Sequence, residues 1–333
     1  MPLLEVKNLC TSFFTDKGEI KVLKNVSFDL ERGKILGIVG ESGSGKSVTV
    51  YSILGILAQN AKVVSGSVKF DGAELIGAPE STIERIRGNK ISIIFQDPMT
   101  SLNPTHTIGK QLTEAILLHT DTDKSGALRR AEELLEMVNI NDKSRRLKQY
   151  PFELSGGMRQ RIMIAMALAS EPDILIADEP TTALDVTIQA SILDLMASLG
   201  KQLGTSIIMI THDLGVIAKM CDEVIVMYAG CIAERGSTED VFYNPRHEYT
   251  KGLLRSVPRP DNIGKRLTVI RGNVIDLTKS HTGCPFAPRC DEVMNICTVK
   301  NADEILLGKN HTVRCWMNQK EEYMSFKRKR PYE

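Results

Sequence analysis

Long hydrophobic runs are missing from the 333-residue sequence. The most apolar stretches, at residues 35–39, 91–95 and 206–210, have the length of a strand, whereas crossing a bilayer takes roughly 20 residues. The first residues, MPLLEVKNL, contain no basic region followed by a long apolar core, so we expect no signal peptide. The sequence therefore predicts a protein that does not itself span a membrane.

An excess of charge of either sign is also missing. Lys and Arg number 42 and Asp and Glu number 41, which gives a formal net charge of +1. No global field steers such a chain towards anionic lipid or nucleic acid, and we expect no nucleic-acid partner. With 42% hydrophobic and 25% charged residues, the composition excludes wholesale disorder and fibrous structure. Any polyanion that this protein binds must be held by local chemistry.

The hydrophobic pattern predicts an α/β fold with two structural units. Apolar runs of strand length alternate with helical periodicity, which favours a mainly parallel core with an antiparallel N-terminal part. Between about residues 100 and 168 the period is helical, so we predict an inserted helical subdomain. Residues 256–267, SVPRPDNIGKRL, contain three helix or strand breakers and predict a linker. We therefore expect one domain at residues 1–255 and a C-terminal extension at 256–333.

A phosphate-binding loop is predicted where a buried strand meets a helix. The pattern G-x4-G-K-S occupies this junction, which is the context in which backbone N–H groups can surround a phosphate. Lys46 would reach the β- and γ-phosphates, and the Ser47 hydroxyl would bind Mg²⁺. The sequence therefore predicts a site for a nucleoside triphosphate. Its residues are Gly40, Ser42, Gly43, Ser44, Gly45, Lys46 and Ser47.

Two carboxylates end a second buried strand, at ILIADE. Asp178 is placed to hold Mg²⁺ through water, and Glu179 could orient and deprotonate an attacking water. A strand that ends in two acids is often a solvated turn, but the upstream phosphate motif favours the catalytic interpretation. We predict that Glu179 is the general base of a hydrolysis reaction.

A third motif, LSGGM, precedes a helical run. Ser155 followed by Gly156 and Gly157 at a helix N-terminus would direct unpaired N–H groups and the positive end of the dipole outward. A plain N-cap would explain Ser155 but not the two glycines, because glycine costs about 1 kcal/mol of helix propensity per residue. We predict a second phosphate-binding element here.

The order of these motifs, followed by TTALD and ITHD, resembles the ABC ATPase cassette over about residues 3–255. The resemblance implies an active site that is completed only in a dimer, where Ser155–Gly157 of one subunit close on the γ-phosphate held by the other. It implies further roles for Gln96 (Mg²⁺, water and a signal towards a membrane partner), Asp185 (the dimer interface), His212 (the γ-phosphate) and Phe13, or its neighbour Phe14 (stacking on adenine).

Further segments, including QDPMTSLNPTHTIGKQL, MYAGCIAERGSTEDVFYNPRHEYTKGLL and GCPFAPRC, resemble the ATP-binding subunits of dipeptide and oligopeptide importers. That family implies MgATP as substrate and a peripheral position on the cytoplasmic face of the cell membrane. It also implies two membrane permease subunits, a second ATPase subunit that is identical or different, and an extracytoplasmic substrate-binding protein as an indirect partner. Because the family includes nickel importers, the transported solute stays open.

Four of the seven cysteines lie close together near the C-terminus, in the pattern C-x5-C-x6-C-x17-C. Zinc sites usually take ligands from tighter C-x2-4-C turns, so the wider gaps favour a 4Fe-4S cluster, with zinc and plain thiols as the alternatives. The resemblance agrees, since some members of this importer family carry a C-terminal iron-sulfur cluster. The predicted ligands are Cys284, Cys290, Cys297 and Cys315.

Two other functions remain open at the level of sequence. One is an ABC ATPase that moves no solute, although no tandem cassette or long coiled-coil insertion is present to support it. The other is an iron-sulfur sensor in which ATP binding is regulatory, which would need a damaged hydrolytic site. Glu179 and His212 are both present and argue against it.

Overall fold

The computed structural model describes residues 1–97, 101–182, 184–257, 269–279 and 281–319. The chain forms two compact units. The first contains Met1–Leu3, Leu30–Ile35 and Gly77–Ile210, and the second contains Leu4–Asp29, Leu36–Ile76 and Thr211–Glu333. The predicted boundary after residue 255 stays a prediction, and most of the expected linker lies outside the described residues.

Three parallel strands form the core of the first unit. They are hydrogen-bonded in the order β8-β7-β6, and almost every residue is buried, as expected for strands covered on both faces. The register places the end of β7 beside the end of β8, with Asp178 opposite Ile210. The strands are β6 (Ile91–Ile94), β7 (Ile174–Asp178) and β8 (Ser206–Ile210).

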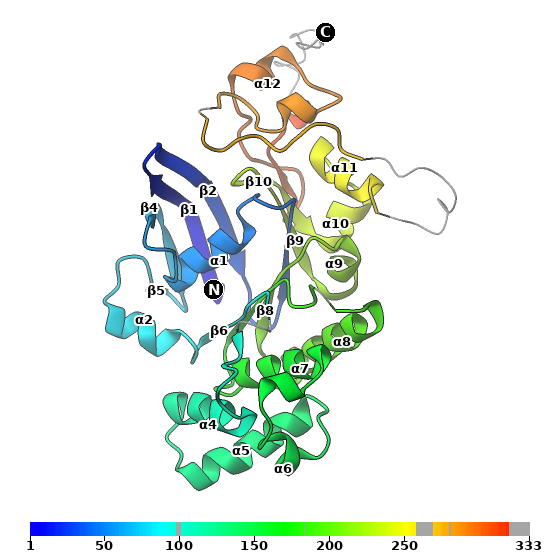
Figure 1. Ribbon diagram of the computed structural model, residues 1–333. Coiled ribbons are helices and arrows are strands. Elements are labelled where there is room, and N and C mark those ends of the chain that lie inside the picture. The colour runs from blue at the N-terminus through cyan, green and yellow to red at the C-terminus, as the bar shows by residue number, and fades with distance from the viewer. Residues whose placement is uncertain (98–100, 183, 258–268, 280, 320–333) are drawn as a thin grey trace. The chain divides into compact units, whose positions relative to one another are not determined.

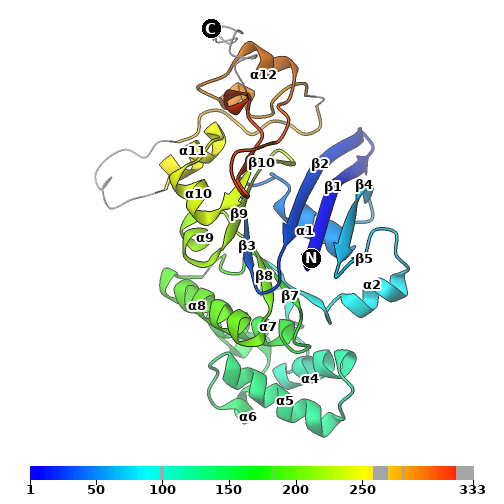
Figure 2. The same cartoon turned by 180° about the vertical axis from the view of Figure 1, so that it is seen from behind.

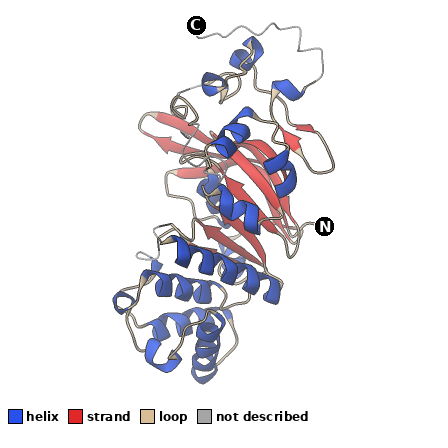
Figure 3. Ribbon diagram, turned by 90° about the vertical axis from the view of Figure 1, so that its right-hand side faces the viewer, coloured by secondary structure: helices blue, strands red, loops and turns tan. Residues whose placement is uncertain are grey.

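The predicted helical insertion is present in the first unit, where Figure 3 shows a group of helices without strands. Helix α4 packs against α5, and both contact α7 (Figure 1). Buried residues at helical spacing, such as Ala127, Ala131, Leu134 and Leu135, explain why α5 is helical and which face it buries. The helices are α2 (Glu80–Ile86), α4 (Ile108–His119), α5 (Lys124–Met137), α6 (Lys143–Arg146), α7 (Gly156–Ala167) and α8 (Val186–Leu203).

An antiparallel sheet forms the N-terminal part of the second unit, as the sequence predicts. Its order is β2-β1-β4-β5, and β1 runs antiparallel to β4, with Leu4 opposite Phe70. Asp71 and Gly72 turn the chain between β4 and β5 with φ of 46° and 82°, the left-handed backbone expected of an Asp-Gly hairpin turn. The strands are β1 (Leu4–Thr15), β2 (Gly18–Leu30), β4 (Ala61–Phe70) and β5 (Ala73–Glu74).

The second unit also contains strands in the order β11-β12-β10-β9-β3. Strand β3 is parallel to β9, and β9 and β10 form the antiparallel pair seen in Figure 2. The C-terminal segment adds β12 to the edge of β10. The elements are β3 (Ile35–Val39), α1 (Lys46–Leu54), α9 (Leu214–Met220), β9 (Glu223–Tyr228), β10 (Cys231–Ser237), α10 (Thr238–Tyr243), α11 (Glu248–Arg255), β11 (Ile305–Leu306) and β12 (Thr312–Val313).

A small apolar core lies within the C-terminal segment. Trp316 is 3% exposed, and its ring N–H donates to the carbonyl of Lys300 at 2.8 Å, so this residue is part of that core. The same segment is joined to β10 by strand pairing and by His311, which lies 2.8 Å from the buried carboxylate of Glu234. The buried residues are Ala287, Val293, Met294, Ile296, Cys297, Ala302 and Trp316, around η3 (Ala287–Arg289), α12 (Asn295–Val299) and η4 (Trp316–Asn318).

Candidate nucleotide-binding and hydrolysis site

The G-x4-G-K-S residues connect β3 to α1 in the second unit, as predicted. Two glycines are required by the backbone. Gly45 precedes the helix with φ of 102°, and a Cβ at Gly40 would lie 2.3 Å from the carbonyl oxygen of Met227. Lys46 is 6% exposed, and its ammonium donates to the carbonyls of Gly40 and Glu41 at 2.8 and 3.1 Å. The positive side chain is therefore held across the loop that would receive phosphate.

The Ser44 hydroxyl supports the interpretation of this loop as a ligand site. Ser44 is 1% exposed, and its oxygen has no hydrogen-bond partner among the described residues. A buried hydroxyl without a partner costs about 1–3 kcal/mol, so its presence indicates a ligand oxygen that completes the bonding. The residues present therefore fit a nucleoside polyphosphate.

Sequence reasoning missed contacts that reach the phosphate loop from residues far along the chain. The backbone N–H of Glu41 donates to the hydroxyl of Tyr249 at 2.8 Å, and the Glu41 carboxylate pairs with Arg289. Nothing in the local motif indicates them, because the partners are 208 and 248 residues away in sequence.

The two predicted acids lie at the end of β7 in the first unit. Asp178 is the last residue of the strand and is 1% exposed. Glu179 has φ of 48°, an uncommon conformation for a non-glycine residue that is concentrated at functional sites. Its N–H donates to the carbonyl of Ile210 at 2.9 Å, which fixes the backbone of this residue at the carboxyl edge of the parallel strands.

Gln96 and Thr182 hold the Glu179 side chain. The Gln96 amide donates to Oε2 at 3.0 Å, and the Thr182 hydroxyl donates to the same oxygen at 3.0 Å. Gln96 lies two residues beyond β6, which ends at Ile94. Thr182 was not predicted, although its position three residues after Glu179 in the TTALD segment could have indicated it.

The residues of the predicted LSGGM motif, called the signature residues below, cap and begin α7. The Ser155 hydroxyl accepts from the N–H of Met158 at 3.3 Å and caps the helix. A Cβ at Gly157 would lie 2.8 Å from Cγ2 of Ile188, so this glycine is required by the packing of α7 against α8 as well as by any ligand. Asp185 caps α8, where its carboxylate accepts from the N–H of Ile188 at 3.0 Å.

The remaining nucleotide-site residues lie in the second unit. His212 is exposed between β8 and α9. Phe13 is half-buried on β1, opposite Ala61, whereas Phe14 is 48% exposed. Both aromatic residues therefore stay candidates for adenine stacking.

The four C-terminal cysteines lie together and line one small cavity with Phe286 and Trp316. Burial, together with repulsion from the neighbouring Cys297 and Cys315 thiolates, raises the pKa of the Cys284 thiol to about 12. Burial also raises the pKa of Cys315 to about 11. Within the described residues, however, no three Cys, His, Asp or Glu side chains form a group that could hold a metal ion.

Among the described residues, no helix is long and apolar enough to cross a membrane.

The fold and these motifs define an ABC ATPase cassette. The chain superposes on the dimeric ATP-binding cassette MJ0796 in a post-hydrolysis state with ADP and Pi, with a TM-score of 0.64 and 28% identity over 71% of this chain and 98% of that one. The family model for ABC transporters matches residues 23–182, and the model for the C-terminal region of oligopeptide/dipeptide transporters matches residues 233–297.

Similar proteins indicate which kind of ABC ATPase this chain is. The dipeptide transport ATP-binding protein DppD of Bacillus subtilis is 52% identical over 95% of this chain and 94% of its own length. The oligopeptide transport ATP-binding protein OppD of Salmonella typhimurium is 50% identical over 89% of this chain and 88% of its own length. The chain therefore belongs to the ATP-binding, ATP-hydrolysing subunits of dipeptide and oligopeptide ABC transporters, which confirms the resemblance found in the sequence.

Proposed function

We propose that this protein hydrolyses MgATP in a dimer of cassettes to drive the import of dipeptides or oligopeptides. The observation that carries the proposal is the constraint on Glu179, whose backbone is left-handed and whose Oε2 accepts from both Gln96 and Thr182. A general base must be held in one orientation to act on a positioned water, and these contacts hold it. The names of the relatives support peptides as the solute.

In this proposal the P-loop residues bind the phosphates, and Lys46 moves its ammonium from the loop carbonyls to the β- and γ-phosphates. Ser47, Gln96 and Asp178 are the residues that would hold Mg²⁺, which would supply positive charge to the phosphates, and Glu179 would take a proton from the attacking water. His212 contacts the γ-phosphate. The signature residues Ser155, Gly156 and Gly157 act on the nucleotide of the partner subunit, Asp185 acts at the dimer interface, and Phe13 or Phe14 stacks on adenine.

The experiment that tests this role is Glu179→Gln in the full-length protein. The amide keeps the side-chain shape but cannot accept the proton, so turnover should fall at least 10²-fold while MgATP still binds and traps a dimer. Glu133→Gln, a change of the same kind at an exposed glutamate on α5, is the matched control and should hydrolyse ATP at the wild-type rate. Wild-type turnover in Glu179→Gln would contradict the assignment.

The proposed partners are two membrane permease subunits, a second ATPase subunit and, indirectly, an extracytoplasmic binding protein. The protein would then lie peripherally on the cytoplasmic face of the membrane. Exposed apolar side chains on α4 and just before α7 support a protein partner for the helical part of the first unit: Leu118 is 75% exposed and Phe152 is 68% exposed. Co-expression with the permeases should bring the protein into the membrane fraction. Recovery in the soluble fraction beside intact permeases would favour the non-transport alternative.

We further propose that Cys284, Cys290, Cys297 and Cys315 hold a 4Fe-4S cluster. Support comes from their shared cavity and from their raised pKa values, because closely placed buried thiols become thiolates only when a cation neutralises them. A single zinc ion would need all four sulfurs about 2.3 Å from one metal atom, whereas a 4Fe-4S cluster binds each sulfur through a different iron and so suits sulfurs that lie farther apart. The cluster would supply positive charge and cross-link the loop.

Metal analysis of anaerobically purified protein tests this second proposal. The protein should contain iron and acid-labile sulfide, and Cys290→Ser should lose both and make the C-terminal segment sensitive to protease. Cys221→Ser is the matched control, because Cys221 is buried in the same unit but does not line the cavity. Stoichiometric zinc without iron would contradict the cluster, and metal-free wild-type protein would contradict any metal site.

A further inference from the structure

The P-loop of this chain carries an acid at its second position, Glu41. A negative charge on a loop that receives three phosphates opposes their binding unless a cation neutralises it. The Glu41 side chain is 27% exposed, so water screens it only in part. The loop therefore needs a positive group in addition to Lys46.

Arg289 supplies that positive group. Its side chain is 4% exposed, and its two terminal nitrogens donate to both carboxylate oxygens of Glu41, at 2.5 and 3.0 Å. Two parallel hydrogen bonds between a guanidinium and a carboxylate fix direction as well as distance. The pair is thus a rigid clamp rather than a solvated surface contact.

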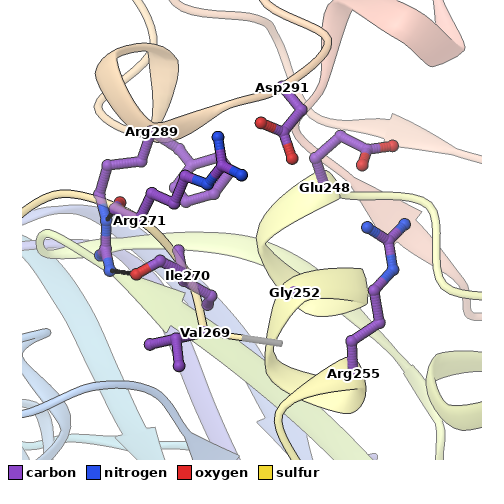
Figure 4. Close-up of a pocket in the computed structure, with 9 residues that line it drawn as sticks. Glu248, Gly252, Arg255, Val269, Ile270, Arg271, Arg289 and Asp291 are labelled. Atoms are coloured by element: carbon purple, nitrogen blue, oxygen red, sulfur yellow. Dashed lines mark hydrogen bonds between the residues drawn. The ribbon is translucent and has the colours of Figure 1, made fainter. Parts of the chain in front are cut away.

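The arginine is itself held on its other side. Its Nε donates to the carbonyl of Arg271 at 3.0 Å, and a terminal nitrogen lies 3.4 Å from the carbonyl oxygen of Ile270 (Figure 4). The guanidinium carbon lies 5.8 Å from the centre of the Tyr228 ring and 6.0 Å from that of Phe286. These contacts use all three nitrogens and leave the guanidinium one orientation, in which it faces Glu41.

The backbone of Glu41 is fixed from the same direction. Its N–H donates to the hydroxyl of Tyr249, a residue with no exposed surface. The centre of the Tyr249 ring lies 4.6 Å from the centre of the Tyr228 ring. The carbonyl of Glu41 accepts from the Lys46 ammonium at 3.1 Å. The position of Glu41 therefore determines where the P-loop lysine rests before it meets a phosphate.

We propose that Arg289 is a positioning residue for nucleotide binding, acting through Glu41. It neutralises the carboxylate, holds it in one orientation and fixes the first turn of the P-loop. This inference rests on the proposed role of residues 40–47 as the MgATP site. If so, the affinity for ATP also depends on the C-terminal segment, because Arg289 lies there between Cys284 and Cys290.

The test measures the dissociation constant of MgATP and the steady-state kinetics of full-length Arg289→Met. We expect the dissociation constant and KM to rise about 10-fold or more, because breaking a buried charge pair leaves an unpaired carboxylate on the loop. The value of kcat at saturating ATP should change less than about 2-fold, a split that a general folding defect would not give. ADP, with one phosphate fewer, should lose less affinity than ATP.

Two further variants separate charge from folding. In a Glu41→Gln background the carboxylate is gone, so adding Arg289→Met should weaken binding by less than about 2-fold relative to Glu41→Gln alone. Arg255→Met is the matched control, because Arg255 lines the same pocket in Figure 4 without contacting Glu41, and it should bind MgATP with the wild-type constant.

The outcomes distinguish this inference from the proposed site. If Lys46→Ala loses MgATP binding while Arg289→Met binds like the wild type, the P-loop assignment stands and the role of Arg289 is refuted. An equal loss in the Glu41→Gln background also refutes it. If the wild type itself does not bind MgATP, or Lys46→Ala binds it equally well, the proposed nucleotide site fails.

Discussion

Removing the Glu234 carboxylate should detach the C-terminal segment from the rest of the second unit. Glu234 lies on β10 with no exposed surface. Its two oxygens accept from the backbone N–H groups of Arg246 and His247, at 2.7 and 2.9 Å, and from His311 at 2.8 Å. An ionised carboxylate can only accept, so the His311 ring donates from Nε2. One side chain thus joins β10, the start of α11 and the residue that precedes β12.

The magnitude follows from these contacts. Glu234→Ala leaves the His247 N–H and the His311 ring nitrogen buried without a partner and the Arg246 N–H partly covered, so we expect a loss of about 3–5 kcal/mol in the free energy of unfolding. Glu234→Gln keeps the shape but places an amide N–H against a donor, and should cost about 2 kcal/mol. His311→Ala should cost about 2 kcal/mol, since both backbone contacts survive.

The single tryptophan provides a local assay, because Trp316 is buried in the C-terminal core. Urea titration followed by tryptophan fluorescence should show the transition of Glu234→Ala at lower urea than that of the wild type, with a separate transition by circular dichroism for the rest of the chain. In the double variant with His311→Ala, the two losses should sum to less than their separate values. A loss below about 1 kcal/mol for Glu234→Ala, or strict additivity, would refute the reasoning.

Two other perturbations give results of definite sign. Gly157→Ala should lower the melting temperature, because overpacking against Ile188 costs about 1–3 kcal/mol and exceeds the propensity gain. Gly156→Ala should be neutral or stabilising, since its Cβ would meet only Leu184 at 3.6 Å. Equal melting temperatures for the Gly157→Ala and Gly156→Ala variants would contradict the packing argument. Burial lowers the pKa of His119 below its usual 6.5, so below that pH the unfolded chain binds more protons than the folded chain, and stability should fall slightly as the pH falls through this range. His119→Gln should remove that slope in thermal melts between pH 5 and 7.5.

The local part of the fold and site could be predicted from the sequence. A strand followed by G-x4-G-K-S, and a buried strand ending in Asp178, each carry their signal within about ten residues, through hydrophobic pattern and glycine placement. The structure confirms both strands and the helical block between them. The local pattern was enough there because β3 and β7 are continuously apolar, as strands buried on both faces are, and α5 buries residues at helical spacing.

Contacts over long sequence distances could not be predicted in this way. The pairing of Arg289 with Glu41 and the addition of β12 to β10 depend on tertiary packing, and a single arginine or a two-residue strand has no periodicity to detect. For Gly157 the sequence predicted a ligand role but not a packing role. The space where a Cβ would stand is taken by Ile188, and this contact exists only once α7 and α8 are packed. Thr182 was overlooked because a threonine after an acid has an ordinary role as a turn residue.

The clamp between Glu41 and Arg289 also has a consequence for the order of events during synthesis. The two residues are 248 positions apart. At about 5–20 residues per second, a ribosome makes the P-loop roughly 12–50 s before it makes the arginine. Through that interval the nascent loop carries an unpaired carboxylate and binds ATP weakly. A fragment released before residue 289 would keep the whole phosphate motif and still compete poorly for nucleotide, so full affinity arrives only once the arginine has been made and has folded onto the loop.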